Sequence, residues 1–538
     1  CIMNSNDMYG NTNQNIMCRY YRPEWTCGRF NAVANVALMY NLIEGKSFFF
    51  ESYSAKVIGE ILKCGRNEQI NLNTISGNTS VPIESIIDFF EQSLVNVGLV
   101  AVKHYNKENI STLRKYWSKI AKEESPHYNL GNLKTEQIID FQTAEVEYNK
   151  HLNPDTQISS VILELTYNCS AKCIHCYNIG ATRNDNEVCG RYIPNEMSID
   201  DYKGLIDELD SLGCYKVCLS GGDPFSKPIV WDIIDYLYHK EIAFDIFTNG
   251  ISITHKVEQL INYYPRLVGI SIYSGVAEIH DRITRINGSF DKSMIVAKQL
   301  SEYGVPMAFK CVVMKPNIKT YHQVKDLAYK YGAVLQIESN LCLGVDGDMS
   351  MINHLRLSRE ELEILFCDKD IPLYVGLDIP NEGKVTKASN AYPCSGGYGT
   401  YAITPKADMV ICVNLHWKLG NVTQSSLKDI LQGEPLKVWR DTTIGKIEGC
   451  GAKPECDYCT LCSGNNYSEH QVLTKPSLVN CYMAEVRYGL MQKLKQGINP
   501  LDGMSVTERL QMLSDCSLEH FNKEIKGVGT YEKINGLS

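Results

Sequence analysis

Three cysteines in the stretch ELTYNCSAKCIHCYN constrain this chain most, because they indicate a metal-binding loop placed directly after a strand. Cys169, Cys173 and Cys176 follow the apolar run of residues 161–165, which predicts that strand. A four-iron four-sulfur cluster normally takes four cysteines, so three local thiolates leave one iron unligated. That open iron can bind a cofactor, and the spacing therefore favours a catalytic cluster over one that only carries electrons.

The triplet resembles the motif of the radical S-adenosylmethionine (SAM) superfamily, with His175 in its aromatic-or-His position and Tyr177 after the last cysteine. The resemblance implies that SAM chelates the open iron. It also implies that one electron cleaves SAM to a 5′-deoxyadenosyl radical, which abstracts hydrogen from the substrate. The alternatives are three unrelated buried thiols or a zinc site, although zinc sites usually pair CxxC with a second such pair.

Composition narrows the classes of function. The 538 residues are too many for one domain, and no apolar run approaches the length of a membrane span. The net charge is -9 and the basic residues are dispersed, which argues against a nucleic-acid surface. The 21 cysteines fall largely into groups, and no signal peptide is recognised. We therefore expect a cytoplasmic protein in a reducing or anaerobic compartment, without membrane or nucleic-acid partners.

The residues after the triplet predict alternating strands and helices. Apolar runs that predict strands lie at residues 216–220, 244–247, 268–272, 308–313 and 335–338, and segments with helical periodicity separate them. This order is typical of parallel βαβ units, in which ligands bind beyond the carboxyl ends of the strands. The fold class expected is α/β, and the resemblance implies a partial (β/α)6 radical SAM barrel over residues 156–345.

Candidate cofactor residues lie at the ends of these predicted strands. The run SGGDPF resembles the family motif Gly-Gly-Glu-Pro, which binds the amino group of SAM, although it would by itself indicate only a turn. The segment HDRITRINGSF resembles one found in peptide-modifying members, in which His280 and Asp281 are expected to be structural. Arg282 is a candidate for a carboxylate. The cofactor-binding residues that the resemblance implies are His175, Tyr177, Gly221, Gly222, Asp223, Pro224, Thr248, Asn249, Ser271 and Arg282.

A second group of cysteines lies downstream and resembles the SPASM extension of radical SAM enzymes, which carries two auxiliary four-iron four-sulfur clusters. With the SAM cluster this makes three clusters. The family order gives the first auxiliary cluster Cys394, Cys412 and Cys462, and the second Cys450, Cys456, Cys459 and Cys481.

The spacing of this group departs from the family pattern, since two residues separate each of Cys456, Cys459 and Cys462. The first cluster then has three ligands, so its open iron takes another side chain or a substrate thiolate. The alternative is a zinc ribbon formed by Cys450, Cys456, Cys459 and Cys462. The remaining cysteines, Cys189 and Cys342 among them, are expected to be small buried hydrophobic residues.

The first hundred residues predict a separate small domain. Strand-like runs at 36–42 and 48–50 are joined by the turn Glu44-Gly45, and a helix is expected near 55–62. A second helical pattern follows at Ile83, Ile86, Ile87, Phe90, Leu94 and Val97. The pattern is similar to the winged-helix recognition element of maturases that act on ribosomally made peptides. Such domains bind the leader of a precursor peptide as an extra strand, whereas the alternative is an ordinary capping domain.

The domain boundaries follow from shifts in composition. We expect a recognition-element-like domain at 1–105, a helical linker at 106–155, the barrel at 156–345, a bridging segment at 346–390, the SPASM domain at 391–485 and C-terminal helices at 486–538.

The function predicted is oxidative cross-linking of a precursor peptide, through a thioether or a carbon–carbon bond. A flavodoxin or ferredoxin is expected as reductant. The alternatives are sulfatase-maturase-like protein oxidation, peptide epimerisation, and a non-catalytic scaffold that binds peptides. No side chain is assigned as a catalytic base.

Overall fold

The computed structural model describes residues 20–106, 108, 110, 112–113, 142–153, 155–156, 158–178, 196–342, 352–369 and 390–513. Most of the predicted linker and of the predicted bridging segment lies outside these ranges, as do residues 514–538 of the predicted C-terminal helices. Cys189, expected to be a buried hydrophobic residue, also lies outside them.

The N-terminal unit is a three-stranded antiparallel sheet followed by helices. Its strands are β1 (Thr26–Asn31), β2 (Val36–Asn41) and β3 (Lys46–Glu51), with β2 in the centre. The main helices are α2 (Ser52–Lys63), α3 (Leu72–Thr79) and α4 (Ile83–Phe89). The strands predicted from residues 36–42 and 48–50 are confirmed, and β1 was not predicted. The assignment of a winged helix stays a prediction.

The parallel unit consists of six strands in chain order with helices between them. The strands are β4 (Ser160–Thr166), β5 (Lys216–Gly221), β6 (Ala243–Thr248), β7 (Leu267–Ser271), β8 (Met307–Val312) and β9 (Val334–Glu338). All six predicted strands are confirmed within one or two residues at each end. The helices are α7 (Ile199–Ser211), α8 (Val230–His239), α9 (Val257–Ile261), α10 (Ala277–Thr284), α11 (Ser289–Glu302) and α12 (His322–Tyr331).

The two faces of the parallel sheet differ in character. On β4, Val161, Leu163 and Leu165 pack into the main apolar core with side chains of α7 and α8. Glu164 and Thr166 belong to the opposite face, because successive side chains of a strand alternate. Helix α7 begins at a capping box formed by Ser198 and Asp201. One face of the sheet is therefore covered by helices, and the opposite face carries the polar residues Glu164 and Thr166.

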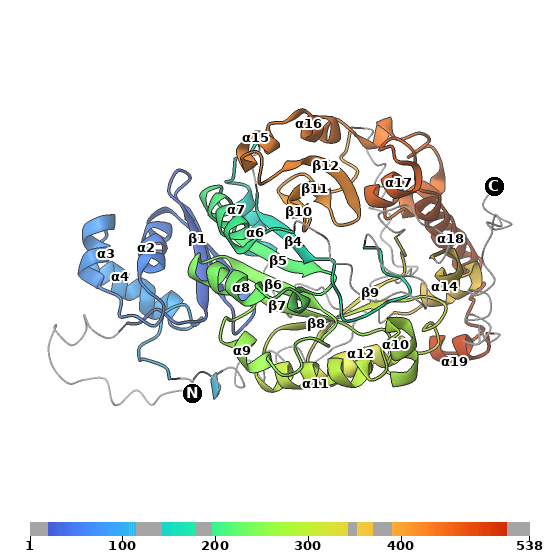
Figure 1. The fold of residues 1–538 in the computed structure, drawn as a ribbon, viewed down its shortest axis with the longest axis horizontal. Coiled ribbons are helices and arrows are strands. Elements are labelled where there is room, and N and C mark those ends of the chain that lie inside the picture. The colour runs from blue at the N-terminus through green and yellow to red at the C-terminus, as the bar shows by residue number, and fades with distance from the viewer. Residues whose placement is uncertain are drawn as a thin grey trace.

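The sheet continues into the C-terminal part of the chain, which the sequence did not predict. Strand β10 (Thr400–Ile403) pairs in parallel with β4, and β11 (Asp408–Cys412) and β12 (Leu415–Asn421) follow in antiparallel order. Figure 1 shows this extension at the side of the parallel unit away from β9, with the N-terminal unit at one end of the molecule.

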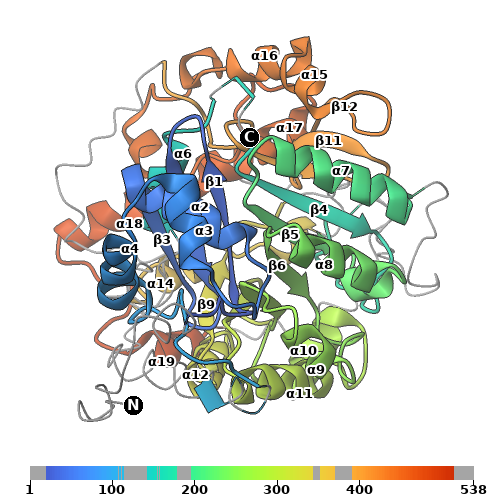
Figure 2. The same ribbon diagram turned by 90° about the vertical axis from the view of Figure 1, so that its left-hand side faces the viewer.

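The remaining helices complete the C-terminal half of the chain. They are α13 (Ile352–Leu355), α14 (Arg359–Leu365), α15 (Leu427–Leu431), α16 (Glu434–Arg440), α17 (Ser463–His470), α18 (Leu478–Lys495) and α19 (Val506–Gln511), and α6 (Gln142–Asn149) precedes β4. Figure 2 views the N-terminal unit from the front, with α2 and α3 in the foreground. Within the described ranges, none of the helices has both the length and the apolar character that a membrane crossing needs.

Candidate active site

The loop that carries Cys169, Cys173 and Cys176, here the cysteine loop, follows β4 at its carboxyl end and is partly buried. Its backbone is bound to the end of α10. Lys172 N donates to Thr284 O at 2.9 Å, and Ile174 N donates to Ile283 O at 3.0 Å. The loop is therefore shaped by backbone contacts with a helix that lies more than a hundred residues away in the sequence.

The three thiols of the cysteine loop interact with one another. The pKa of Cys169 is raised well above its ordinary value, first by burial and then by the charges of Asp223, Cys173 and Cys176. Across the described ranges, no three or more His, Cys, Asp or Glu side chains are grouped tightly enough to hold a single metal ion. The cysteines of a four-iron cluster bind different irons, so their thiols need not converge on one point.

Gly221 and Gly222 let the end of β5 pack directly against the backbone that leads into the cysteine loop. Gly222 N donates to Thr166 O at 2.7 Å, and a Cβ atom at Gly222 would lie 2.2 Å from Asn168 O. Gly221 has a φ of +120°, which side-chain-bearing residues rarely adopt. Both glycines are thus required by a close approach within the protein.

The Asp223 carboxylate joins the ends of two strands. It is fully buried and accepts hydrogen bonds from Thr248 Oγ1 at 2.7 Å, Asn249 N at 2.9 Å and Phe225 N at 3.0 Å. Burial raises its pKa, and the three hydrogen bonds oppose that rise. The carboxylate is thus fully engaged with the protein, and it joins the end of β5 to the end of β6.

Asn249 and Tyr273 bring the ends of β6 and β7 to the cysteine loop. Asn249 Nδ2 donates to Cys169 Sγ at 3.3 Å, and Asn249 Oδ1 accepts from Ser170 Oγ at 3.2 Å. The Tyr273 hydroxyl interacts with both Ser271 and Cys173. The predicted residues Thr248, Asn249 and Ser271 therefore lie together beside the cysteine triplet.

His175 and His280 pack near Tyr273 as neutral rings. The His175 ring meets Tyr273 edge-on at a centroid distance of 4.7 Å, and the His280 ring is stacked on Tyr273 at 5.5 Å. Burial lowers the pKa of each histidine to about 4. His280 Nδ1 accepts from Tyr273 N, so His280 is structural as expected, whereas His175 Nδ1 is buried and no acceptor or donor in the described ranges pairs with it.

Arg282 does not join this site. Its guanidinium pairs with Glu278 on the exposed side of α10, and 43% of its side chain is accessible. Asp281, the residue before it, accepts from Gly288 N, Ser289 Oγ and Phe290 N at the start of α11. The segment from His280 to Phe290 thus builds the junction between α10 and α11.

The structure places four cysteines, the first cysteine set, near one another beyond the sheet. Cys412 interacts electrostatically with Cys394 and Cys462, and Cys342 interacts with Cys412 and Cys462. Cys412 ends β11, Cys462 precedes α17, and Cys342 lies four residues after β9. The first three were grouped from the sequence. Cys342 was expected to be only a buried hydrophobic residue, yet it supplies a fourth thiol.

The second cysteine set, Cys450, Cys456, Cys459 and Cys481, lines a single cavity of about 240 Å³ between the loop before α17 and the start of α18. Cys462, which the zinc-ribbon alternative requires in this group, interacts instead with Cys394 and Cys412. The contacts therefore favour the division of the downstream cysteines that was made by order in the chain.

Tyr177 lies between the cysteine loop and the first cysteine set. Its hydroxyl interacts with Cys176, with Cys342 and with the carboxyl group of Glu164 on β4. Glu164 is 1% exposed, and its Oε1 atom has no hydrogen-bond partner in the described part of the chain. Neither Glu164 nor Tyr273 was predicted from the sequence as a site residue. A carboxylate inside an otherwise apolar strand was the available signal for Glu164.

Comparisons with known proteins identify two regions of the chain. Residues 163–328 match the radical SAM superfamily, and residues 394–463 match SPASM, an iron-sulfur cluster-binding domain. The mycofactocin maturase MftC of Mycobacterium tuberculosis is 25% identical over 314 residues, which cover 56% of this chain and 76% of that protein. The antilisterial bacteriocin subtilosin biosynthesis protein AlbA of Bacillus subtilis is 28% identical over 315 residues, which cover 56% of this chain and 65% of AlbA.

Solved structures are also similar to this chain. Streptococcus suis SuiB, bound to its precursor peptide SuiA, aligns over 86% of this chain and 99% of its own, with 14% identity and a TM-score of 0.48. The N-terminal unit lies outside both the radical SAM match and the SPASM match.

Proposed function

We propose that this radical SAM enzyme, which also carries a SPASM domain, forms an oxidative cross-link in a ribosomally made precursor peptide. The observation that carries the proposal is that one continuous sheet joins the cysteine loop to the first cysteine set. The similarity to a maturase and to a bacteriocin biosynthesis protein supports a peptide as substrate.

Cys169, Cys173 and Cys176 would hold the cluster that binds SAM. When bound, SAM supplies a 5′-deoxyadenosyl radical that takes a hydrogen atom from the peptide. The backbone of Gly221 to Pro224 would bind the amino group of SAM, and Asn249 orients Cys169 through its 3.3 Å hydrogen bond. His175 would support the cysteine loop beside the cluster, because its ring packs edge-on against Tyr273.

The two downstream sets would hold two auxiliary clusters, with Cys342 as the fourth ligand of the first. Four cysteines leave no iron open to a substrate thiol. The first auxiliary cluster would then accept an electron. Formation of one bond between two peptide atoms removes two hydrogens from the peptide. One leaves as a hydrogen atom to the 5′-deoxyadenosyl radical, and the other leaves as a proton and an electron. Tyr177 and Glu164 lie between the two cysteine groups, where that electron would travel.

The N-terminal unit would bind the leader of the precursor as an added strand. In the described residues β1 and β3 are the edges of the sheet, and each pairs only with β2. Beside β3, the Phe50 ring meets Phe89 at 6.0 Å, and Tyr53 is 56% exposed. A sheet edge beside partly exposed aromatic rings suits a peptide with apolar side chains. A flavodoxin or ferredoxin in a reducing cytoplasm would supply the first electron.

The test is the mass of the short peptide encoded beside this protein after anaerobic co-expression with it. Loss of two hydrogens for each modified site supports a cross-link, and fragmentation then locates the bond. The control is Cys173→Ala, which should leave the peptide unmodified because the SAM cluster cannot form. An unchanged mass with the intact enzyme would contradict cross-linking and direct attention to epimerisation or a protein substrate.

A further inference from the structure

The N-terminal unit covers the end of the parallel unit at which the strands begin. A shared apolar core joins residues of β1 and β2 to Tyr215, Ala243 and Tyr264. Tyr215 directly precedes β5, Ala243 begins β6, and Tyr264 lies three residues before β7. The cysteine loop lies at the opposite end, because it follows the carboxyl end of β4. The whole length of the strands therefore separates the N-terminal unit from the cysteine loop.

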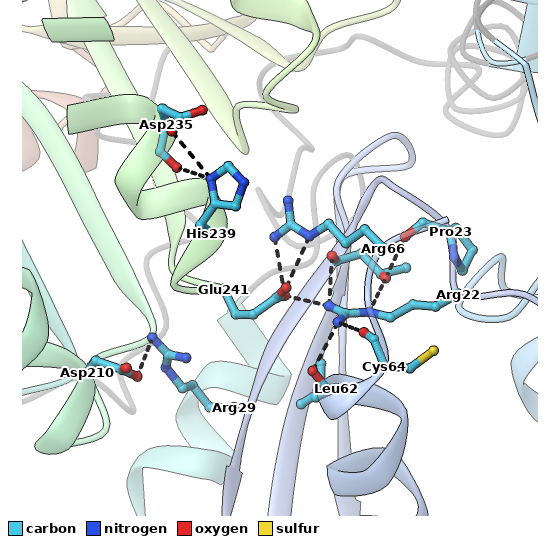
Figure 3. A network of polar contacts seen from close by, with 11 residues as sticks. Arg22, Pro23, Arg29, Leu62, Cys64, Arg66, Asp210, Asp235, His239 and Glu241 are labelled. Atoms are coloured by element: carbon cyan, nitrogen blue, oxygen red, sulfur yellow. Dashed lines mark hydrogen bonds and ion pairs between the residues drawn. The ribbon is translucent and has the colours of Figure 1, made fainter. Parts of the chain in front are cut away.

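Glu241 holds the two units together through two arginines (Figure 3). It lies in the turn between α8 and β6. Arg66 donates to both carboxylate oxygens, from Nε to Oε1 and from Nη2 to Oε2, at 3.2 Å each. Arg22 Nη2 also donates to the carboxylate, and Arg22 Nη1 donates to Leu62 O and Cys64 O. Both arginines come from the N-terminal unit.

The backbone of Glu241 is also unusual. Its φ is +60°, in the left-handed region, where a residue with a side chain is uncommon and glycine is favoured. Such a conformation persists where surrounding contacts hold it. The ion pairs with Arg22 and Arg66 provide those contacts, and the turn presents the carboxylate directly to them.

Three further polar contacts lie at this joint. Arg29 Nε donates to Cys214 O at 2.9 Å. The Arg29 guanidinium also pairs with Asp210 at 3.1 Å, as Figure 3 shows. Tyr264 Oη donates to Glu24 Oε2 at 3.0 Å. The contacts reach the loops before β5, β6 and β7, so the N-terminal unit is bound to the parallel unit at three separate places.

We infer that Glu241 is a specificity-determining residue, because it fixes the N-terminal unit relative to the parallel unit. The enzyme then selects the peptide residue that it modifies by the distance of that residue from the bound leader. This inference rests on the proposed function. Strands β5 and β6 have six residues each, a length of about 20 Å at roughly 3.3 Å per residue. A fully extended peptide covers about the same length per residue. The modified residue should therefore lie at least about six residues from the bound leader segment.

The test uses the full-length protein and the variant Glu241→Gly. Glycine suits a φ of +60°, so this variant removes the carboxylate without straining the turn. Hydrogen exchange of the substrate-free protein should rise at least about tenfold at residues 22–31 and 64–68, which face the joint, because the arginines lose their partner. The matched control is Glu302→Gln, which removes an exposed carboxylate on α11. Unchanged exchange in Glu241→Gly would overturn the fixing role.

The second measurement uses precursor peptides whose spacer is shortened or lengthened residue by residue. Wild-type enzyme should modify the residue at one separation, and Glu241→Gly should spread modification over neighbouring positions. A variant with raised exchange and an unchanged position would overturn the selection by separation. If wild-type enzyme modifies none of these peptides, the proposed function fails, while the exchange measurement still decides whether Glu241 fixes the joint.

Discussion

At the scale of single residues, the Cys342 thiol lies among cysteines that come from three other parts of the chain. On the proposed assignment of three clusters of equal size, Cys342→Ser removes the fourth ligand of the first auxiliary cluster and should lower the iron content by up to about one third. Cys367→Ser is the control, because Cys367 is a buried cysteine outside both sets. Iron analysis and electron paramagnetic resonance measure the result. Equal iron in the two variants would contradict the ligand role.

Glu164 gives a prediction for pH dependence. Burial raises its pKa from an ordinary value of 4.5 to about 8, against the effect of a hydrogen bond from Tyr167. Between these values the unfolded chain releases a proton that the folded protein keeps, so Glu164 lowers stability progressively as the pH rises from about 4.5 to 8. Glu164→Gln should therefore raise the Tm by a few degrees at pH 8, roughly, and by little near pH 5. Thermal unfolding at several pH values tests this, and a gain independent of pH would contradict it.

At the scale of elements, the contact between the ends of β4 and β5 sets the position of the cysteine loop. Gly222→Ala would place a Cβ atom 2.2 Å from Asn168 O, directly before Cys169. The strand end must then separate from the loop, and we expect reduced iron at the SAM cluster and slower SAM cleavage. Gly204→Ala in α7 is the matched control, since a Cβ atom there meets nothing within 4 Å. Cluster absorbance after reconstitution, compared between the two variants, gives the answer, and equal absorbance would argue against this packing role.

At the scale of the whole molecule, the N-terminal unit shares an apolar core with the parallel unit and is not a detachable appendage. Deletion of residues 1–105 would expose Tyr215, Ala243 and Tyr264, each at most 5% accessible in the intact protein, and would leave Glu241 without its arginines. We expect the truncated protein to be less soluble and to unfold several degrees lower, by about 1 °C for each kcal/mol lost at this chain length. Sedimentation and thermal unfolding measure this. A truncated protein as stable as the full chain would show that the shared core contributes little.

The sequence by itself determined the six parallel strands, the position of the cysteine triplet after the first of them, and the second group of cysteines. These features are local, because apolar runs, turn residues and cysteine spacing each lie within a short segment of the sequence. Residues such as Asn249 and Ser271 could be placed near the triplet because parallel strands bring their carboxyl ends to one edge.

Only the tertiary structure decided which distant groups meet. Cys342 interacts with Cys412 and Cys462. Cys342 follows β9, at one edge of the sheet, whereas Cys412 ends β11, which lies near the other edge. Arg282 carries the charge expected of a ligand, but the rotation of α10 directs it to Glu278 and solvent. Glu241 forms its ion pairs with arginines that lie about two hundred residues earlier in the sequence. Such contacts depend on how elements pack in space, which neither spacing nor periodicity specifies.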